Sequence, residues 1–414
     1  MQNNQAMEKI AYETVAPVLT EYTKWVLSDC HKKGLKKVYF LARDGYSLLH
    51  IANEICKQNN FDIECKYLYC SRYSLRIPSY HLIGDEAFKK LFLKGYYYSA
   101  INIFKRAGLS DKEISEFSKE FKIEGVNASM SEVEFEELTK KLSSSDKFRE
   151  KVLSISKNSF ENAIAYFKEQ GVFDSEEVVI VDSGWAGSMQ RTLRQLLDGA
   201  GYKGKIIGYY FGLVCKQKEE DGEYNTYYFN CKKGLKRRIM FNNNVFECMM
   251  SANHGMTMGY QKKNGKMQPI LNDYENAEMQ SIVETQIEFI KKFAKENDLS
   301  CKDYNLKKSL KKTYKLLKSF MVYPTSEEVD VFGKFMFCDD VTENYHMSLA
   351  DKRLTKALKQ HMIIPRIFNK ILRRKKTTEP LFWPYAIVVF QPKILRPWYR
   401  LNLFVWYLIS YILH

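Results

Sequence analysis

The sequence predicts an α/β protein in which helices cover both faces of a mostly parallel β-sheet. Two segments carry this prediction, because each reads as a strand, a polar turn with glycine and a helix. In residues 178–197 the unbroken apolar run VVIV is typical of a strand buried on both faces, and Asp182 follows where that strand should end. Residues 37–49, KVYFLARDGYSLL, repeat the pattern with Asp44 before the glycine. Such strand–turn–helix units indicate a Rossmann-like sheet of three layers.

The other elements can be placed in order along the chain. A helix is expected from about residue 5 to residue 33, where Gly34 would end it. From residue 85 to about residue 170 only helical patterns occur, which predicts a helical insertion able to act as a lid, or a plain helical subdomain. The remaining strands are expected at Lys66–Cys70, Gly204–Cys215 and Tyr224–Asn230. A loop is expected at Ser71–Ile83.

Composition divides the chain into three regions. Residues 1–265 are expected to form the Rossmann-like domain, with its insertion at about 85–170. Residues 266–345 are expected to form a helical region, and residues 346–414 a basic and aromatic tail. Two stretches read as irregular, a polar turn region over 262–272 and an acidic linker over 324–349.

The predicted sheet would bring polar side chains together at one edge, because ligands bind where parallel strands end. Gly184 and Gly187 would let a ligand approach the backbone. The helix expected from Ser188 would point its free N–H groups and positive dipole end at the same turn. A phosphate site is therefore predicted from Arg72, Ser183, Gly184, Gly187 and Ser188. The alternative is an ordinary turn with a capping serine.

Four residues are candidates for catalysis: Asp44, Asp182, Glu247 and His254. Asp44 and Asp182 are also expected to hold Mg²⁺, which keeps several waters and bridges substrate phosphates. Glu247 lies in an apolar run, where a buried carboxyl needs a partner or a raised pKa. His254 precedes Gly255 at an expected bend, and the alternative for it is a structural role.

Charge and cysteine content restrict the class of protein. The net charge is +15, and residues 301–414 hold 21 Lys and Arg against 9 Asp and Glu, which is +12 of that total. This excess suits anionic lipid or nucleic acid, but no RNA-binding signature or zinc spacing supports nucleic acid as a partner. The nine cysteines form no CxxC motif and indicate free thiols in a reducing compartment. The first residues lack the apolar run of a secretory signal, so a cytoplasmic location is expected.

The tail is predicted to lie on a membrane. Leu381–Phe390 and Leu401–Leu413 are rich in Trp, Tyr, Phe and Ile, are separated by QPKILRPWYR, and follow the basic run RRKK at 373–376. Neither apolar piece reaches the ~20 residues of a spanning helix. Trp, Tyr and Arg favour the membrane interface, so we expect a peripheral anchor on the anionic inner face of the cell membrane. The fold of residues 1 to about 345 would then be complete without the tail. The alternative is a tail packed on the protein's own core.

Four motifs together resemble the haloacid-dehalogenase-like proteins of bacterial surface-polysaccharide gene clusters: FLARDGYSLL, YLYCSRYSLRIPS, VDSGWAGSMQRTL and FECMMSANHGMTMGY. The resemblance is to the second domain of the longer members and covers roughly residues 10–265. It implies an acid/base role for Asp44, a phosphate-holding role for Ser71 and a metal-binding role for Asp182. Arg43 or Arg72 would replace the superfamily's lysine.

Ala42 departs from the superfamily pattern, because it stands where that pattern has the nucleophilic aspartate. Without this carboxylate no phospho-aspartyl intermediate can form at that position. Ordinary phosphatase activity by that route is therefore not expected.

The resemblance and the predicted site together suggest a membrane-associated cytoplasmic protein of surface-polysaccharide assembly. It would act on, or bind, a phosphorylated or nucleotide-linked sugar, as a hydrolase or transferase with Mg²⁺. One alternative, favoured by Ala42, is a non-catalytic module that binds a phosphorylated ligand or a glycosyltransferase partner. Another is a glycosyltransferase with Asp182 as metal ligand, which would release free nucleotide.

Overall fold

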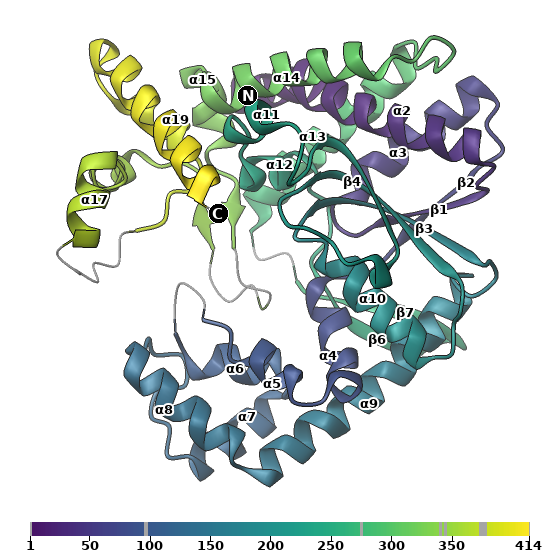
Figure 1. Cartoon of the computed structure of the whole chain (residues 1–414), viewed down its shortest axis with the longest axis vertical. Coiled ribbons are helices and arrows are strands. Elements are labelled where there is room, and N and C mark those ends of the chain that lie inside the picture. Colours follow the sequence, from purple (N-terminus) through teal and green to yellow (C-terminus); the bar gives the residue numbers. More distant parts are fainter. Residues whose placement is uncertain are drawn as a thin grey trace.

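A computed structural model describes residues 2–94, 98–273, 276–338, 342, 346–371 and 379–413. At its centre is one sheet with the strand order β2-β1-β3-β4-β5, in which all neighbours are parallel (Figure 1). Its strands are β1 (Lys37–Leu41), β2 (Glu64–Leu68), β3 (Glu177–Trp185), β4 (Lys205–Leu213) and β5 (Glu223–Phe229). The predicted α/β class with a parallel sheet is confirmed. The strand order reverses between β1 and β3, which is the place where open α/β sheets bind ligands.

Helices cover both faces of this sheet, as predicted. In β1, Val38 and Phe40 belong to the core on one face, whereas Tyr39 and Leu41 belong to the core on the other. The first face carries α2 (Ala16–Lys33), α3 (Gly45–Asn59), α13 (Ala277–Glu296) and α14 (Leu306–Val322). The second carries α4 (Arg72–Ile83), α9 (Asp146–Glu169) and α10 (Ser188–Gly199).

The chain begins with the helical segment expected before the first strand. It consists of α1 (Gln2–Ile10), a π-helical turn at Ala11–Val15, and α2. Gly34 ends α2 with a φ of 71°, a left-handed conformation that glycine adopts without a steric penalty.

The insertion is a bundle of short helices with its own core. Phe104, Phe117 and Phe148 pack at its centre. Figure 1 shows the bundle at the bottom of the molecule, joined to the sheet through α4 and α9. Its other helices are α5 (Glu86–Leu91), α6 (Ala100–Arg106), α7 (Asp111–Glu120) and α8 (Glu132–Ser143).

The segment Ser71–Ile83 is a helix and not the expected loop. The Ser71 hydroxyl accepts a hydrogen bond from the Ser74 amide at 3.0 Å, and the Ser74 hydroxyl accepts one from the Ser71 amide at 2.9 Å. This reciprocal capping satisfies amides that the start of a helix leaves unpaired. A loop was expected because proline usually ends or kinks a helix, but Pro78 lies inside α4.

Residues 262–272 also differ from the expected turn region. They belong to an antiparallel hairpin of β6 (Thr257–Lys263) and β7 (Lys266–Leu271). Asn264 and Gly265 have φ values of 52° and 78°, as a tight hairpin turn requires. Tyr260 packs into the second core, so the hairpin brings Thr257 to the edge of the sheet.

The remaining elements are short and lie mostly in the C-terminal third. The expected linker over 324–349 contains α15 (Ser326–Phe332) and a pair of two-residue strands, β8 (Met336–Phe337) and β9 (Met347–Ser348). The others are α11 (Leu235–Ile239), α12 (Asn243–Met249), α16 (Thr355–Gln360), α17 (Ile363–Ile371), α18 (Pro384–Ile387) and α19 (Arg396–Leu413).

Leu381–Phe390 was expected at a membrane interface, and this expectation is wrong. Trp383 is fully buried, its indole N–H donates to the Met321 carbonyl at 2.9 Å, and its ring centroid lies 5.4 Å from that of Phe320. The segment therefore completes the first core, and residues 1 to about 345 are not a complete fold. Hydropathy alone cannot separate burial in a core from burial in lipid.

Within the described residues, no helix combines the length and the apolar character that crossing a membrane requires. The basic run at 373–376 lies outside the described residues.

Candidate functional site

The candidate site is a cavity at the carboxyl edge of the sheet, beside the β1/β3 reversal. We name it the sheet-edge cavity; its volume is about 180 Å³. A second cavity of about 120 Å³ continues from it and shares four of its lining residues, Arg43, Asp44, Arg72 and Glu247. The sheet-edge cavity is lined by Ala42, Arg43, Asp44, Cys70, Ser71, Arg72, Asp182, Ser183, Gly184, Trp185, Ala186, Ser188, Met189, Glu247, Met256 and Thr257.

Three helices begin at this cavity, because each follows one of its three strands. α3 starts after Asp44, α4 after Ser71 and α10 after Gly187. Each helix start carries a partial positive charge, which stabilises an anion bound next to it. The guanidinium groups of Arg43 and Arg72 add two full positive charges at the same place.

Asp44 and Asp182 lie close enough in the cavity to affect each other. Burial raises the pKa of Asp44, although the hydroxyl and the amide of Ser183 donate hydrogen bonds that oppose the shift. Burial, followed by the charge of Asp44, raises the pKa of Asp182 well above its usual value. The negative charge of Asp44 that raises the proton affinity of Asp182 also favours a cation bound between the two carboxyl groups.

The backbone at Asp182 is fixed by Tyr22 of α2, which packs on the first face of the sheet. The Tyr22 hydroxyl donates to the carbonyl groups of Asp182 and Tyr209, at 2.9 Å and 2.8 Å. Strand β3 also continues past Asp182 to Trp185, paired with β4. Asp182 is thus held inside the strand and not at its expected end.

Glu247 reaches the cavity from α12, a part of the chain distant from the other acidic residues. Its carboxylate accepts a hydrogen bond from the indole N–H of Trp185 at 2.6 Å. Burial, followed by the charge of Asp44, raises the pKa of Glu247 to about 7. A carboxyl group with this pKa can both take up and give away a proton near neutral pH.

Trp185 is a site residue that the sequence did not single out. Its φ is 64°, a conformation that side-chain-bearing residues rarely adopt and that costs of order 1–3 kcal/mol. The indole is held by aromatic contacts with Phe241 and Phe246, at centroid distances of 5.3 Å and 6.0 Å. Such strain is retained where the surroundings fix it, and here it aims the indole N–H at Glu247. The sequence signal that could have identified Trp185 is its position directly after Ser-Gly near the expected end of a strand.

Among its described lining residues, the cavity offers only two neighbouring aspartates for the predicted magnesium site. In the part of the chain that the structure describes, no three His, Cys, Asp or Glu residues are grouped as a metal site. Asp44 and Asp182 form a pair, and Mg²⁺ is commonly held by one or two carboxylates together with substrate phosphates and water. The pair suits a cation that arrives with a phosphorylated ligand, and Mg²⁺ stays a prediction.

The structure places His254 beside the cavity, outside its lining. Its Nε2 lies 2.8 Å from the Tyr67 hydroxyl, and its Nδ1 lies 2.8 Å from the Gly255 carbonyl. Burial lowers the pKa of His254, which favours the neutral ring. With both ring nitrogens engaged, this histidine supports the loop that carries Met256 and Thr257, and we assign it no chemical step.

The predicted phosphate-binding residues differ in their position relative to the cavity and in the contacts they already make. Ser71 and Ser188 line the cavity, but the Ser71 hydroxyl already donates to the Thr257 carbonyl at 2.6 Å. Gly184 is required by packing, since a Cβ there would come within 2.3 Å of the Gly212 carbonyl. Gly187 does not line the cavity, and a Cβ there would meet Gln217 at 2.5 Å. Both glycines have positive φ, so the chain geometry by itself accounts for them.

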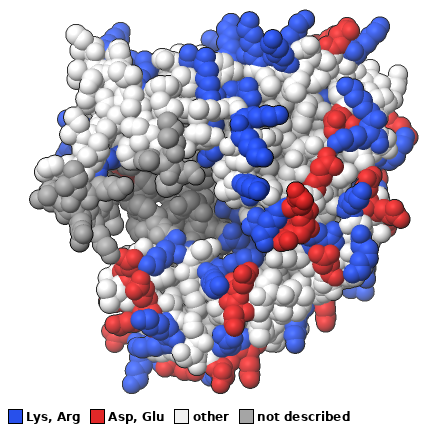
Figure 2. All heavy atoms as spheres, viewed as in Figure 1, with Lys and Arg blue, Asp and Glu red and all other residues white. Residues whose placement is uncertain are grey.

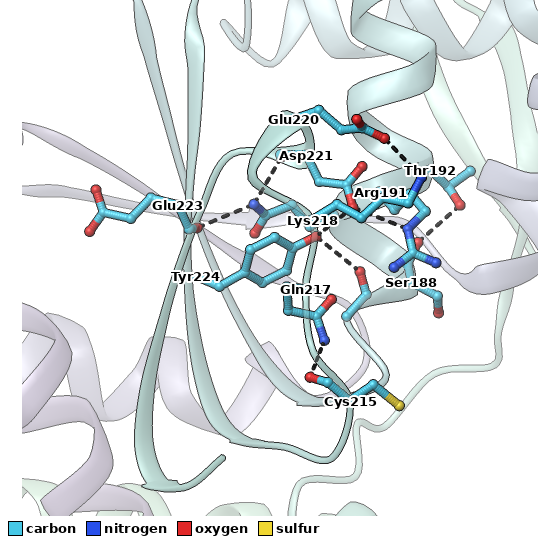
Figure 3. A network of polar contacts seen from close by, with 12 residues as sticks. Ser188, Arg191, Thr192, Cys215, Gln217, Lys218, Glu220, Asp221, Glu223 and Tyr224 are labelled. Atoms are coloured by element: carbon cyan, nitrogen blue, oxygen red, sulfur yellow. Dashed lines mark hydrogen bonds and ion pairs between the residues drawn. The ribbon is translucent and has the colours of Figure 1, made fainter. Parts of the chain in front are cut away.

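A polar network behind α10 fixes the start of that helix (Figure 3). Arg191 forms an ion pair with Asp221 at 3.1 Å, and the Tyr224 hydroxyl lies 3.4 Å from the same carboxylate. Gln190 donates from α10 to the Asp221 carbonyl at 3.0 Å. The network ties α10 to the segment before β5, so the free amides of the helix keep a fixed direction toward the cavity.

The fold and the site therefore define an α/β protein with a cavity of acidic and basic residues at the carboxyl edge of its parallel sheet. A scan of protein families finds no match for the chain, and a search of curated proteins finds none either.

Proposed function

We propose that the sheet-edge cavity binds the phosphate of a phosphorylated or nucleotide-linked sugar and catalyses its hydrolysis or transfer. The proposal places this reaction in the assembly of a surface polysaccharide, in keeping with the motif resemblance. One observation carries it: two arginines, three helix starts and three carboxyl groups meet in a single cavity. All nine cysteines are free, which supports a reducing cytoplasmic location.

Charge supports a phosphate in preference to an uncharged sugar alone. Arg43 and Arg72 line both connected cavities and can bind phosphate oxygens through paired N–H groups. The helix starts of α4 and α10 add backbone donors. Asp44 and Asp182 would hold a magnesium ion, which would neutralise phosphate charge when bound. These residues together orient the phosphate and exclude much of the water around it.

Glu247 is the proposed general base. With Ala42 at the nucleophile position, an acceptor hydroxyl or water has to attack phosphorus directly. Glu247 takes the proton of that group as the new P–O bond forms and the bond to the leaving group breaks. Its pKa of about 7 matches the task, because general bases work best when their pKa is near the operating pH. Trp185 is a positioning residue, since its indole N–H holds the carboxylate in place.

The test is turnover by the purified full chain. Sugar phosphates and sugar nucleotides are incubated with Mg²⁺, and phosphorus NMR follows the loss of substrate phosphate signals. Glu247→Gln is expected to lower kcat by 10²–10⁴-fold with a small effect on KM, the usual range for loss of a general base. Asp62→Asn is a matched control, because Asp62 lies before β2, at the opposite edge of the sheet, and is 91% exposed. Equal turnover in the Glu247→Gln variant and the parent chain would refute the proposed role of Glu247.

A second candidate is a non-catalytic module that binds a phosphorylated ligand or a glycosyltransferase, and Ala42 favours it. Calorimetry with the same compounds separates the two functions. Binding without turnover, lost in an Arg72→Ala variant, would support the module. Binding with turnover would support the enzyme.

A further inference from the structure

The C-terminal helices leave an unusual amount of apolar surface exposed. Residues 364–368 and 394–401 carry seven of the sixteen large hydrophobic side chains that are exposed in the described part of the chain. Their exposed fractions range from 44% for Leu395 to 86% for Ile394. We name this surface the α17–α19 face; it consists of Ile364, Ile367, Phe368, Ile394, Leu395, Trp398 and Leu401.

The folded chain itself holds this face outward. On α19, Tyr399 and Leu403 are buried against the body, while Trp398 and Leu401 lie on the other side of the helix. On α17, Ile364, Ile367 and Phe368 are spaced three and four residues apart and so share one face. The two helices contact each other, with the Arg366 guanidinium 4.2 Å from the Trp406 ring centroid. Figure 1 shows both helices at the left side of the molecule.

The chain around this face is strongly basic. Residues 352–414 contain 13 Lys and Arg but only one acidic residue, Glu379. Lys393 and Arg400 alternate with the apolar side chains near the start of α19. In Figure 2 the surface at the upper left, over α19, is mostly white, with Lys and Arg gathered along the adjoining top edge over α14. An apolar face with cations beside it matches a surface that is apolar inside and negatively charged outside.

We propose that the α17–α19 face docks on an anionic lipid bilayer, with both helices lying in the interface. Trp and Arg are among the residues that favour this region, and an amphipathic helix buries its apolar side ~5–10 Å into it. A second copy of the chain is a poorer occupant, because a symmetric contact would place the same cations opposite each other. The proposal does not depend on the chemistry of the sheet-edge cavity.

Vesicle co-sedimentation of the full chain tests the proposal. The wild type is expected to sediment with vesicles that contain phosphatidylglycerol and to bind vesicles of pure phosphatidylcholine less. The double variant Ile394→Asp, Trp398→Asp is expected to lose at least tenfold in binding. Val133→Asp is the matched control, since Val133 is 65% exposed on α8 in the insertion, and it should bind like the wild type.

Charge is tested separately from apolar contact. Lys393→Gln should weaken binding to the anionic vesicles about fivefold, since one cation near such a surface contributes ~1 kcal/mol. Lys112→Gln on α7, also exposed, should have no effect. Full binding by the Ile394→Asp, Trp398→Asp variant would overturn the proposal, as would a wild type that binds neither kind of vesicle. Self-association of the wild type in solution that is lost in this variant would overturn it too, because a second copy would then cover the face.

Discussion

The three carboxyl groups of the sheet-edge cavity bind protons more tightly than ordinary acidic side chains do. Each has a raised pKa, first because of burial, and for Asp182 and Glu247 also because of the charge of Asp44. A raised pKa means that the folded chain binds protons more tightly than the unfolded chain. Ionising these groups therefore lowers the free energy of unfolding.

Glu247→Gln should make stability less dependent on pH. Glutamate has an ordinary pKa of 4.5 and a folded pKa of about 7, so wild-type stability falls as the pH rises between these values and the penalty is complete above pH 7. The variant should match the wild type near pH 4 and exceed it at pH 8, by an amount on the order of 1–3 kcal/mol. Urea unfolding at both pH values measures this. A constant difference at all pH values would show that Glu247 does not titrate in this range.

Magnesium should stabilise the chain through Asp44 and Asp182. Without Mg²⁺, Asp44→Asn and Asp182→Asn should raise Tm or leave it unchanged, since each removes one of two like charges. With Mg²⁺ at a hundred times its Kd, the wild type should gain ~2.7 kcal/mol, and each variant should gain less. Thermal unfolding with and without Mg²⁺ measures the difference, with Asp62→Asn as the control. An equal gain in all four proteins would exclude the pair as ligands.

At the scale of elements, the turn between β3 and α10 is determined by its own packing. Gly187 was expected to be needed by a ligand, but its φ of 64° favours glycine in any case, and an added Cβ would lie 2.5 Å from the side-chain oxygen of Gln217. The polar network around Asp221 then fixes α10 behind it. Loss of this geometry would move the helix start that faces the cavity.

Gly187→Val should therefore destabilise the fold before it affects any ligand. A β-branched residue at this φ costs of order 1–3 kcal/mol, and the clash with Gln217 adds to that. The midpoint of urea unfolding should fall accordingly. Gly259→Ala in β6 is the control, since nothing lies within 4 Å of the added Cβ, and its midpoint should change little. An unchanged midpoint for Gly187→Val would mean that the turn can relax.

The sequence predicted elements well where one periodic signal was strong. The apolar run at Val178–Val181 identified β3, and Asp44 and Ser71 were correctly placed at the carboxyl edge. The sequence-based prediction was wrong where local signals competed. Pro78 led to a loop being expected in place of α4. The polar residues around 262–272 led to a turn region being expected in place of the β6–β7 hairpin, although Asn264-Gly265 is a typical hairpin turn. Trp185 could not be assigned, because its partner Glu247 is 62 residues away.

At the scale of the whole molecule, Trp383 shows that the C-terminal region belongs to the main core. It fills space between α14 and α15, with ring contacts to Phe320 and Phe332. The sequence could not place it, since an aromatic-rich stretch suits both a core and a membrane interface. The choice depends on whether the rest of the fold leaves room for it.

Trp383→Ala should lower the free energy of unfolding by ~3–5 kcal/mol, the usual range for truncating a fully buried Trp. The expected measurement is a lower urea midpoint with near-normal slope. Trp398→Ala provides the matched control, because Trp398 is 50% exposed, and surface substitutions usually change stability by less than ~0.5 kcal/mol. Equal effects of the two substitutions would contradict the described packing of Trp383 against α14 and α15.

The burial of Trp383 also affects how the protein is made. All five strands of the sheet have been synthesised once residue 229 leaves the ribosome, but the first core still lacks α13, α14 and Trp383. At ~5–20 residues per second, the nascent chain waits roughly eight to thirty seconds until Trp383 has been added. During that time only the N-terminal helices, α2 and α3 among them, cover this face of the β-sheet, and the apolar surface left exposed is prone to aggregation. We therefore expect this chain to be a client of chaperones that bind at the ribosome.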